Sequence, residues 1–226
     1  MFWKKRNIVN NSTDLYSIHI PKTAGSSFKK VLGLVYGDHL GVLNRGQIRK
    51  KETTVEDFME NQYKVIHGHL YISDLKDYLR PNSKVITWLR HPVDRVLSNY
   101  FYTNSVERKS DSIDPNKREK IDLEDYINRD LRKNLISRYL EGINLEDLFF
   151  VGFQENFSSD LNLLAQKLDW SSEALIDEPR INENATSRYK NLDLDDEILK
   201  RIEVLNERDL EIYSRALDLK SKNYWS

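Results

Sequence analysis

Short apolar runs alternate along the chain with stretches of helical periodicity. The runs lie at residues 15–20, 63–67, 84–89 and 148–151, and their length and composition are typical of buried strands. Between them, apolar positions recur every three to four residues, as at Phe28, Val31, Leu32 and Val35. Strands that alternate with helices predict an α/β fold, with a central, mostly parallel sheet flanked by helices.

The expected helices have recognisable ends in two places. The first begins at about Ser26 and should stop at Gly37, and a second should begin at Pro92, where a helix loses no backbone donor. Three further helical patterns lie at about 122–140, 156–168 and 195–217.

The length of 226 residues suits a single domain, residues 1–226. Residues 1–13 are expected to form an N-terminal extension. Nine of the fifteen residues at 106–120 are charged and Pro115 interrupts them, which predicts a charged, mobile, solvated loop. The chain shows no internal repeat.

The charge balance narrows the range of ligands and partners. The 35 basic and 36 acidic residues give a net charge of -1, so no overall field attracts nucleic acid or an anionic membrane. An anionic ligand must therefore be held by a local cluster of donors.

The sequence has no cysteine, which excludes disulfides, thiolate metal sites and cysteine nucleophiles. The basic residues near the N-terminus precede a polar stretch at 7–14 instead of the apolar one of a signal peptide. No window approaches the roughly 18 apolar residues of a membrane span. These features predict a cytoplasmic protein.

The first strand runs directly into the sequence PKTAGSSF, residues 21–28, where a helix begins. A helix N-terminus attracts anions, and small residues let the backbone curl around one. Such a loop favours a phosphate site, although a tight turn with a serine N-cap would show the same letters. The donors of this site would come from one run of residues: Lys22, Thr23, Ala24, Gly25, Ser26 and Ser27.

A second segment, LRHPVDRVLSNY at 89–100, follows the third strand in the same way. Arg90 stands at the strand's carboxyl end and Ser98 on the next helix, so the two could bind a second phosphate. Alternatively, Arg90 could pair with Asp94 and cap that helix.

Together the two segments resemble the sulfotransferases that use 3′-phosphoadenosine 5′-phosphosulfate (PAPS), and in particular the carbohydrate group that includes the heparan sulfate 2-O-sulfotransferases. The resemblance implies a P-loop-like three-layer fold. It also implies that residues 22–27 bind the 5′-phosphosulfate, and that Arg90 and Ser98 bind the 3′-phosphate.

The resemblance extends, more diffusely, over about residues 14–217. VGFQENF at 151–157 and the NENATSR segment at 182–188 look like the corresponding parts of bacterial members. In the family, the latter segment often closes over the nucleotide. This implies a nucleotide-binding role for Ser187 and Arg188.

A base must remove the proton of an acceptor hydroxyl, and histidine has a suitable pKa for that work. His67-Gly68-His69 follows the second expected strand and resembles a motif of the 2-O-sulfotransferases, whose second histidine is taken as the base. The resemblance implies that His69 is the base and that His67 supports it or orients the acceptor, although the sequence does not decide which of the two is the base. His19 alternates with isoleucines on a strand, which indicates a core histidine, and His91 is expected to be structural.

The function expected from this resemblance is transfer of a sulfuryl group from PAPS to an acceptor hydroxyl, with 3′,5′-adenosine bisphosphate (PAP) as product and no metal. The acceptor would be a saccharide or glycolipid. Segments 40–62 and 106–120 are candidates for acceptor contact. Two alternatives remain, an ATP-dependent P-loop kinase and a nucleotide-binding module without catalysis. Against the kinase, the lysine of the loop precedes its glycine.

Overall fold

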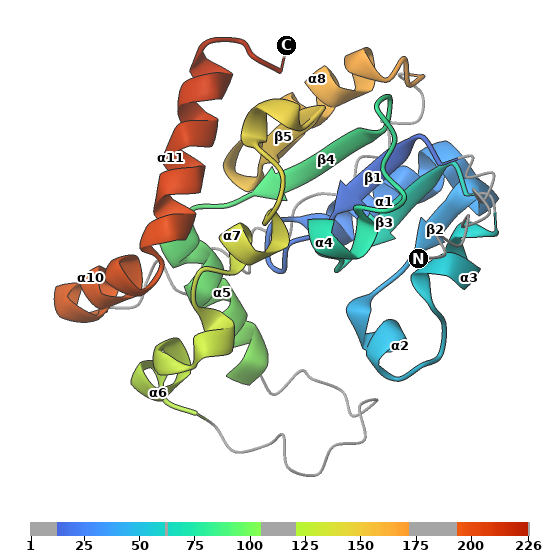
Figure 1. The fold of residues 1–226 in the computed structure, drawn as a ribbon. Coiled ribbons are helices and arrows are strands. Elements are labelled where there is room, and N and C mark those ends of the chain that lie inside the picture. The colour runs from blue at the N-terminus through green and yellow to red at the C-terminus, as the bar shows by residue number, and fades with distance from the viewer. Residues whose placement is uncertain (1–12, 62, 105–120, 172–193, 226) are drawn as a thin grey trace, which may run out of the picture.

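The computed structural model describes residues 13–61, 63–104, 121–171 and 194–225. Its five strands form one parallel sheet in the order β2-β3-β1-β4-β5. The strands are β1 (Leu15–Ile18), β2 (Leu40–Val42), β3 (Val65–Gly68), β4 (Lys84–Leu89) and β5 (Phe150–Phe153). Figure 1 shows this sheet at the centre of the molecule with helices around it.

Helices α1 (Gly25–Tyr36) and α8 (Phe157–Lys167) cover one face of the sheet. Trp88 on β4 identifies this face, because its ring contacts Phe28 of α1 at 5.2 Å and Phe157 of α8 at 4.5 Å between centroids. Ser17 of β1 and His67 of β3 pair in register and point to the same face.

The opposite face is covered around α4 (Ile72–Leu75) and α7 (Leu135–Tyr139), which lie in front of the sheet in Figure 1. Tyr16 of β1 donates a hydrogen bond to the Tyr78 carbonyl just after α4, and Tyr71 packs edge-on against Tyr139 of α7. The predicted α/β fold, a parallel sheet between two helical layers, is confirmed.

The helix expected at 122–140 is interrupted. It consists of α6 (Leu123–Asn128), a 3₁₀ turn at Asp130–Arg132 and α7. Asn134 has a left-handed backbone conformation with φ of 48°, which a continuing helix does not allow. The carboxylate of Asp209 then accepts hydrogen bonds from the first amides of α7, those of Ile136 and Ser137.

The last expected helix, at 195–217, is also two helices, α10 (Asp196–Leu205) and α11 (Glu207–Ser221). The chain breaks at Asn206, whose side-chain oxygen accepts a hydrogen bond from the Asn134 amide. This hydrogen bond joins the break before α7 to the break between α10 and α11, so each break stabilises the other.

Other differences concern short elements. The strand expected at 148–151 lies two residues later, the one expected at 63–67 also begins and ends later, and the first strand stops at Ile18. The sequence did not predict β2, α2 (Arg45–Arg49), α3 (Val55–Met59) or α4, which are too short to show a period. The helix at Pro92 was predicted and is α5 (Pro92–Asn104).

The charged loop expected at 106–120 and most of the expected N-terminal extension lie outside the described residues. Of that extension only Thr13 is described. It is buried and its hydroxyl donates to the Tyr63 carbonyl, so it belongs to the domain. None of the helices in the described ranges combines the length and the apolar character needed to cross a membrane.

Candidate active site

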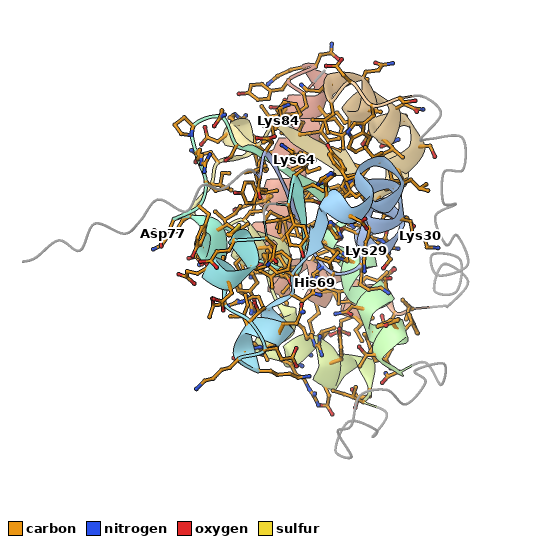
Figure 2. The ribbon with its side chains drawn as sticks, turned by 90° about the vertical axis from the view of Figure 1, so that its right-hand side faces the viewer. Lys29, Lys30, Lys64, His69, Asp77 and Lys84 are labelled. Carbon is orange, nitrogen blue, oxygen red and sulfur yellow. The ribbon has the colours of Figure 1, made fainter. Side chains whose placement is uncertain are left out.

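Three chemically important segments end up at one edge of the sheet. Because all strands are parallel, the carboxyl ends of β1, β3 and β4 meet there, followed by the loop at 21–27, by His69 and by Arg90. Figure 2 shows His69 at this edge, and Lys64, just before β3, and Lys84, the first residue of β4, toward the opposite one. Open α/β sheets bind ligands at the carboxyl edge.

The segment 21–27, called here the phosphate loop, curls tightly before α1. Lys22 and Ala24 both have left-handed backbone conformations, with φ of 73° and 68°. Ala24 is the N-cap of α1, no side chain caps the helix, and its first turn contains no acidic residue. The alternative of an ordinary serine N-cap is therefore wrong, and the first amides of α1 remain available to an anion.

The hydroxyl residues of the phosphate loop differ in what they can do. Thr23 is buried and its hydroxyl donates to the Ile20 carbonyl at 2.8 Å, which stabilises the turn. Ser26 is exposed and Ser27 half-buried, at the start of α1. An anion could thus be contacted by the hydroxyls of the two serines, and by Thr23 only through its backbone.

Arg90 connects the two predicted phosphate sites. Its guanidinium donates to the Lys22 carbonyl at 3.3 Å, so the end of β4 is joined to the phosphate loop. Arg90 and Ser98 of α5 are both buried, at 4% exposure each. A buried arginine beside an uncapped helix N-terminus is a donor set suited to phosphates, and the buried hydroxyl of Ser98 follows on α5.

Lys22 supplies the second positive charge. Burial, and then the nearby charge of Arg90, lower its pKa from 10.5 to about 8. Its ammonium group lies 4.0 Å from the centre of the Tyr102 ring, a cation–π contact. Lys22 and Arg90 repel each other, and an anion bound between them would relieve this repulsion.

His69 is held in one tautomer. Its Nδ1 lies 2.7 Å from the His19 carbonyl oxygen, which can only accept, so Nδ1 carries the proton. Nε2 therefore keeps its lone pair. Burial lowers the pKa of His69, and the hydrogen bond to His19 partly offsets this, so the ring is neutral near pH 7. His69 thus has the protonation state that a general base needs.

The glycine of the His-Gly-His motif allows a close backbone approach. A Cβ at Gly68 would lie 1.6 Å from the Leu43 carbonyl oxygen. Next to it, the Asn44 side chain accepts from the His69 amide at 3.1 Å, and the Arg45 amide donates to the His69 carbonyl. Part of segment 40–62 therefore lies beside His69.

His67 lies deeper than His69. It is 1% exposed, its Nδ1 is 2.8 Å from the Ser17 hydroxyl, and burial followed by the neighbouring His69 and Lys29 lowers its pKa to about 3. A ring so far from solvent supports the site from below and does not reach an acceptor.

Sequence reasoning missed His19. It was expected to be a core histidine, but it is only half-buried, and its ring stacks on His69 at 4.1 Å between centroids. The signal was only its place next to the phosphate loop. His91, expected to be structural, donates its amide to Glu155 and packs edge-on against Tyr213.

Some predicted residues do not join this cluster. Ser187 and Arg188 lie outside the described residues. Across the described ranges, no three histidine or carboxylate side chains come together as a metal site. The binding and catalytic roles of the clustered residues stay predictions.

Comparison with known proteins decides the family. The model of the sulfotransferase family matches residues 5–214, nearly the whole chain. The chain belongs to the sulfotransferase family. Among solved structures, this sulfotransferase is similar to the mouse sulfotransferase SULT7A1 complexed with PAP, with 12% identity and a TM-score of 0.43. The match covers 84% of this chain and 63% of the mouse chain. No curated protein matches the sequence.

Proposed function

We propose that this sulfotransferase moves the sulfuryl group of PAPS to a hydroxyl of an acceptor, with His69 as the general base. One observation carries the proposal: His69 is neutral with an unprotonated Nε2, and its ring stacks on the His19 ring, which in turn contacts the phosphate loop at Gly25. Family membership supports the choice of donor.

In this proposal the phosphate loop and Lys22 bind the 5′-phosphosulfate, and Arg90 and Ser98 bind the 3′-phosphate. The residues fit such a ligand, because the loop offers uncapped amides, the cation of Lys22 and two serine hydroxyls, while Arg90 and Ser98 add a buried cation and a buried hydroxyl. Lys22 lies next to Arg90, so the two place positive charge at the phosphate loop.

The reaction is an in-line displacement at sulfur. The acceptor oxygen forms a bond to sulfur as the bond between sulfur and the bridging oxygen of the donor breaks, and PAP leaves. The acceptor proton passes to Nε2 of His69. Lys22 and the loop amides stabilise the negative charge that builds on the leaving oxygen, which is the largest contribution in many enzymes.

The acceptor is proposed to be a carbohydrate, on the resemblance of the His-Gly-His motif to the 2-O-sulfotransferases. The segment at 43–45 lies against His69 and is the first candidate for acceptor contact. Cytoplasmic localisation stays a prediction from the sequence.

Thermal melting tests the donor site first. A ligand at 100 times its dissociation constant stabilises a protein by about 2.7 kcal/mol. We expect PAP to raise the melting temperature and ATP with Mg²⁺ to leave it unchanged. A melting shift with ATP and Mg²⁺ but not with PAP would contradict the proposed sulfotransferase activity and favour a kinase.

Two variants separate binding from chemistry. His69→Ala should lower sulfuryl transfer from PAPS to a panel of saccharides by about 100-fold or more, since general bases contribute that much, and should keep the PAP melting shift. Arg90→Ala should lose the PAP shift. The matched control is His39→Ala, an exposed histidine that precedes β2 at the other edge of the sheet. Transfer that survives in His69→Ala would remove His69 from the mechanism.

A further inference from the structure

Three histidine rings form a continuous stack at the carboxyl edge of the sheet. His19 is the middle ring: its centroid lies 4.1 Å from that of His69 and 5.0 Å from that of His67, with interplanar angles of 25° and 22°. The ring of the proposed base is therefore covered on one side by a second, nearly parallel imidazole.

The same ring also touches the phosphate loop. A Cβ built on Gly25, the first residue of α1, would lie 1.9 Å from Cδ2 and 2.0 Å from Nε2 of His19. Only a glycine allows this approach. The His19 side chain thus contacts both the start of α1 and the imidazole of His69.

The backbone of His19 fixes the two strands against each other at this point. Its amide donates to the Gly68 carbonyl at 2.8 Å, and its carbonyl accepts from Nδ1 of His69. Because the carbonyl belongs to the backbone, every substitution of the His19 side chain leaves that hydrogen bond in place. The function of the ring can therefore be tested separately from the tautomer of His69.

The His19 ring does not take up a second proton near pH 7. Burial, then the neighbouring His69, His67, Lys29 and Lys22, lower its pKa to about 2, so it stays neutral. The Arg45 amide donates to the His69 carbonyl, and the Arg45 guanidinium pairs with Asp74.

We infer that His19 is a positioning residue, whose ring orients the imidazole of His69, shields it from water and couples it to the phosphate loop. The inference rests on the proposed function. A flat ring on one side restricts rotation of His69 about its side-chain bonds.

The first test is independent of activity. In the full chain, NMR titration of ring nitrogens reports the pKa and tautomer of His69. In His19→Ala water reaches the ring, so the depressed pKa of His69 should rise toward its ordinary value of 6.5, while Nδ1 keeps its proton. His19→Phe restores an apolar, flat neighbour and should keep the pKa low. An unchanged pKa in His19→Ala overturns the shielding.

The second test uses rates. PAPS hydrolysis, with water in place of the acceptor and PAP release as the readout, should fall about 10- to 100-fold in His19→Ala, the scale of a misplaced catalytic group. As the pH is lowered, the hydrolysis rate of His19→Ala should begin to fall at a higher pH than that of the parent, because the raised pKa of His69 means that the base becomes protonated at a higher pH. PAP should still raise the melting temperature. His19→Phe should recover most of the rate.

The outcomes separate the two ideas. A parent chain without hydrolysis or saccharide transfer contradicts the proposed function, and the NMR titration then still tests the positioning. An active parent with unchanged rate and pH profile in His19→Ala contradicts the positioning alone. If His19→Ala does not fold, His19→Leu fills most of the space without a flat face, and full activity in it overturns the inference.

Discussion

At the residue scale, the proposed site consists of side chains that come from three different strand ends and lie at the carboxyl edge of the sheet. Lys22, Arg90 and His69 stand in motifs that follow strands, so their common edge followed from a parallel sheet. His19 could not be assigned to the site, because its alternation with isoleucines is the pattern of a core residue. Its stacking depends on the pairing of Ile18 with Gly68, which no local pattern contains.

The lowered pKa of Lys22 predicts a pH dependence of nucleotide binding. Free Lys22 loses its proton at about pH 8, and a bound phosphate raises its pKa because an anion favours the charged form. PAP affinity should therefore be constant from pH 7 to about 8 and fall above it, by up to about 10-fold per pH unit as one proton must be taken up. Calorimetric dissociation constants between pH 7 and 9.5 measure this.

Lys22→Arg is the matched control for that experiment. Arginine stays charged over the whole range, so its binding curve should have no step near pH 8. A parent whose affinity stays flat to pH 9.5 would show that Lys22 does not face the bound phosphates.

At the scale of single elements, long periodic segments were predictable and interruptions were not. α1, α5 and α8 follow their apolar periods closely. The segment at 122–140 has the same kind of period, yet it breaks where Asn134 takes a left-handed conformation. The groups that stabilise this break, Asn206 and Asp209, are more than 70 residues away in the chain. A local pattern therefore could not reveal it.

Two glycines of α1 should respond in opposite ways to alanine. In Gly25→Ala the new methyl group meets the His19 ring at 1.9 Å, so the ring or the helix start must move, and we expect loss of the PAP melting shift and of transfer. At Gly33 an added Cβ meets nothing within 4 Å, so Gly33→Ala should stabilise the helix by about 0.5–1 kcal/mol with activity unchanged. Chemical denaturation and PAP release measure both effects. Normal PAP binding in Gly25→Ala would contradict the tight contact between His19 and α1.

At the scale of the whole molecule, the parallel sheet was predictable, but the anchoring of the C-terminal helices was not. Figure 1 shows α11 running beside the sheet, with its first turn near α5 and α7. There the fully buried Asp209 accepts hydrogen bonds from the amides of Ile136 and Ser137 in α7. Its carboxylate also lies 3.9 Å from the guanidinium of Arg95, which is 1% exposed. Arg95 belongs to α5, which also carries Ser98, so this ion pair links the C-terminal helix to the proposed nucleotide site.

This buried pair should be a major contributor to stability when one partner is removed. Asp209→Asn leaves Arg95 buried without a countercharge, and we expect a loss of about 3–5 kcal/mol in the free energy of unfolding. Urea unfolding should show a lower midpoint at an unchanged m value. The matched control is Glu146→Gln, which breaks the exposed pair of Glu146 with Arg215 on the same helix α11 and should have no resolvable effect. If Asp209→Asn does not fold, adding Arg95→Met removes the stranded charge and should recover folding. If Asp209→Asn alone is as stable as Glu146→Gln, Asp209 stabilises the fold through its hydrogen bonds to the α7 amides and not through the charge of Arg95.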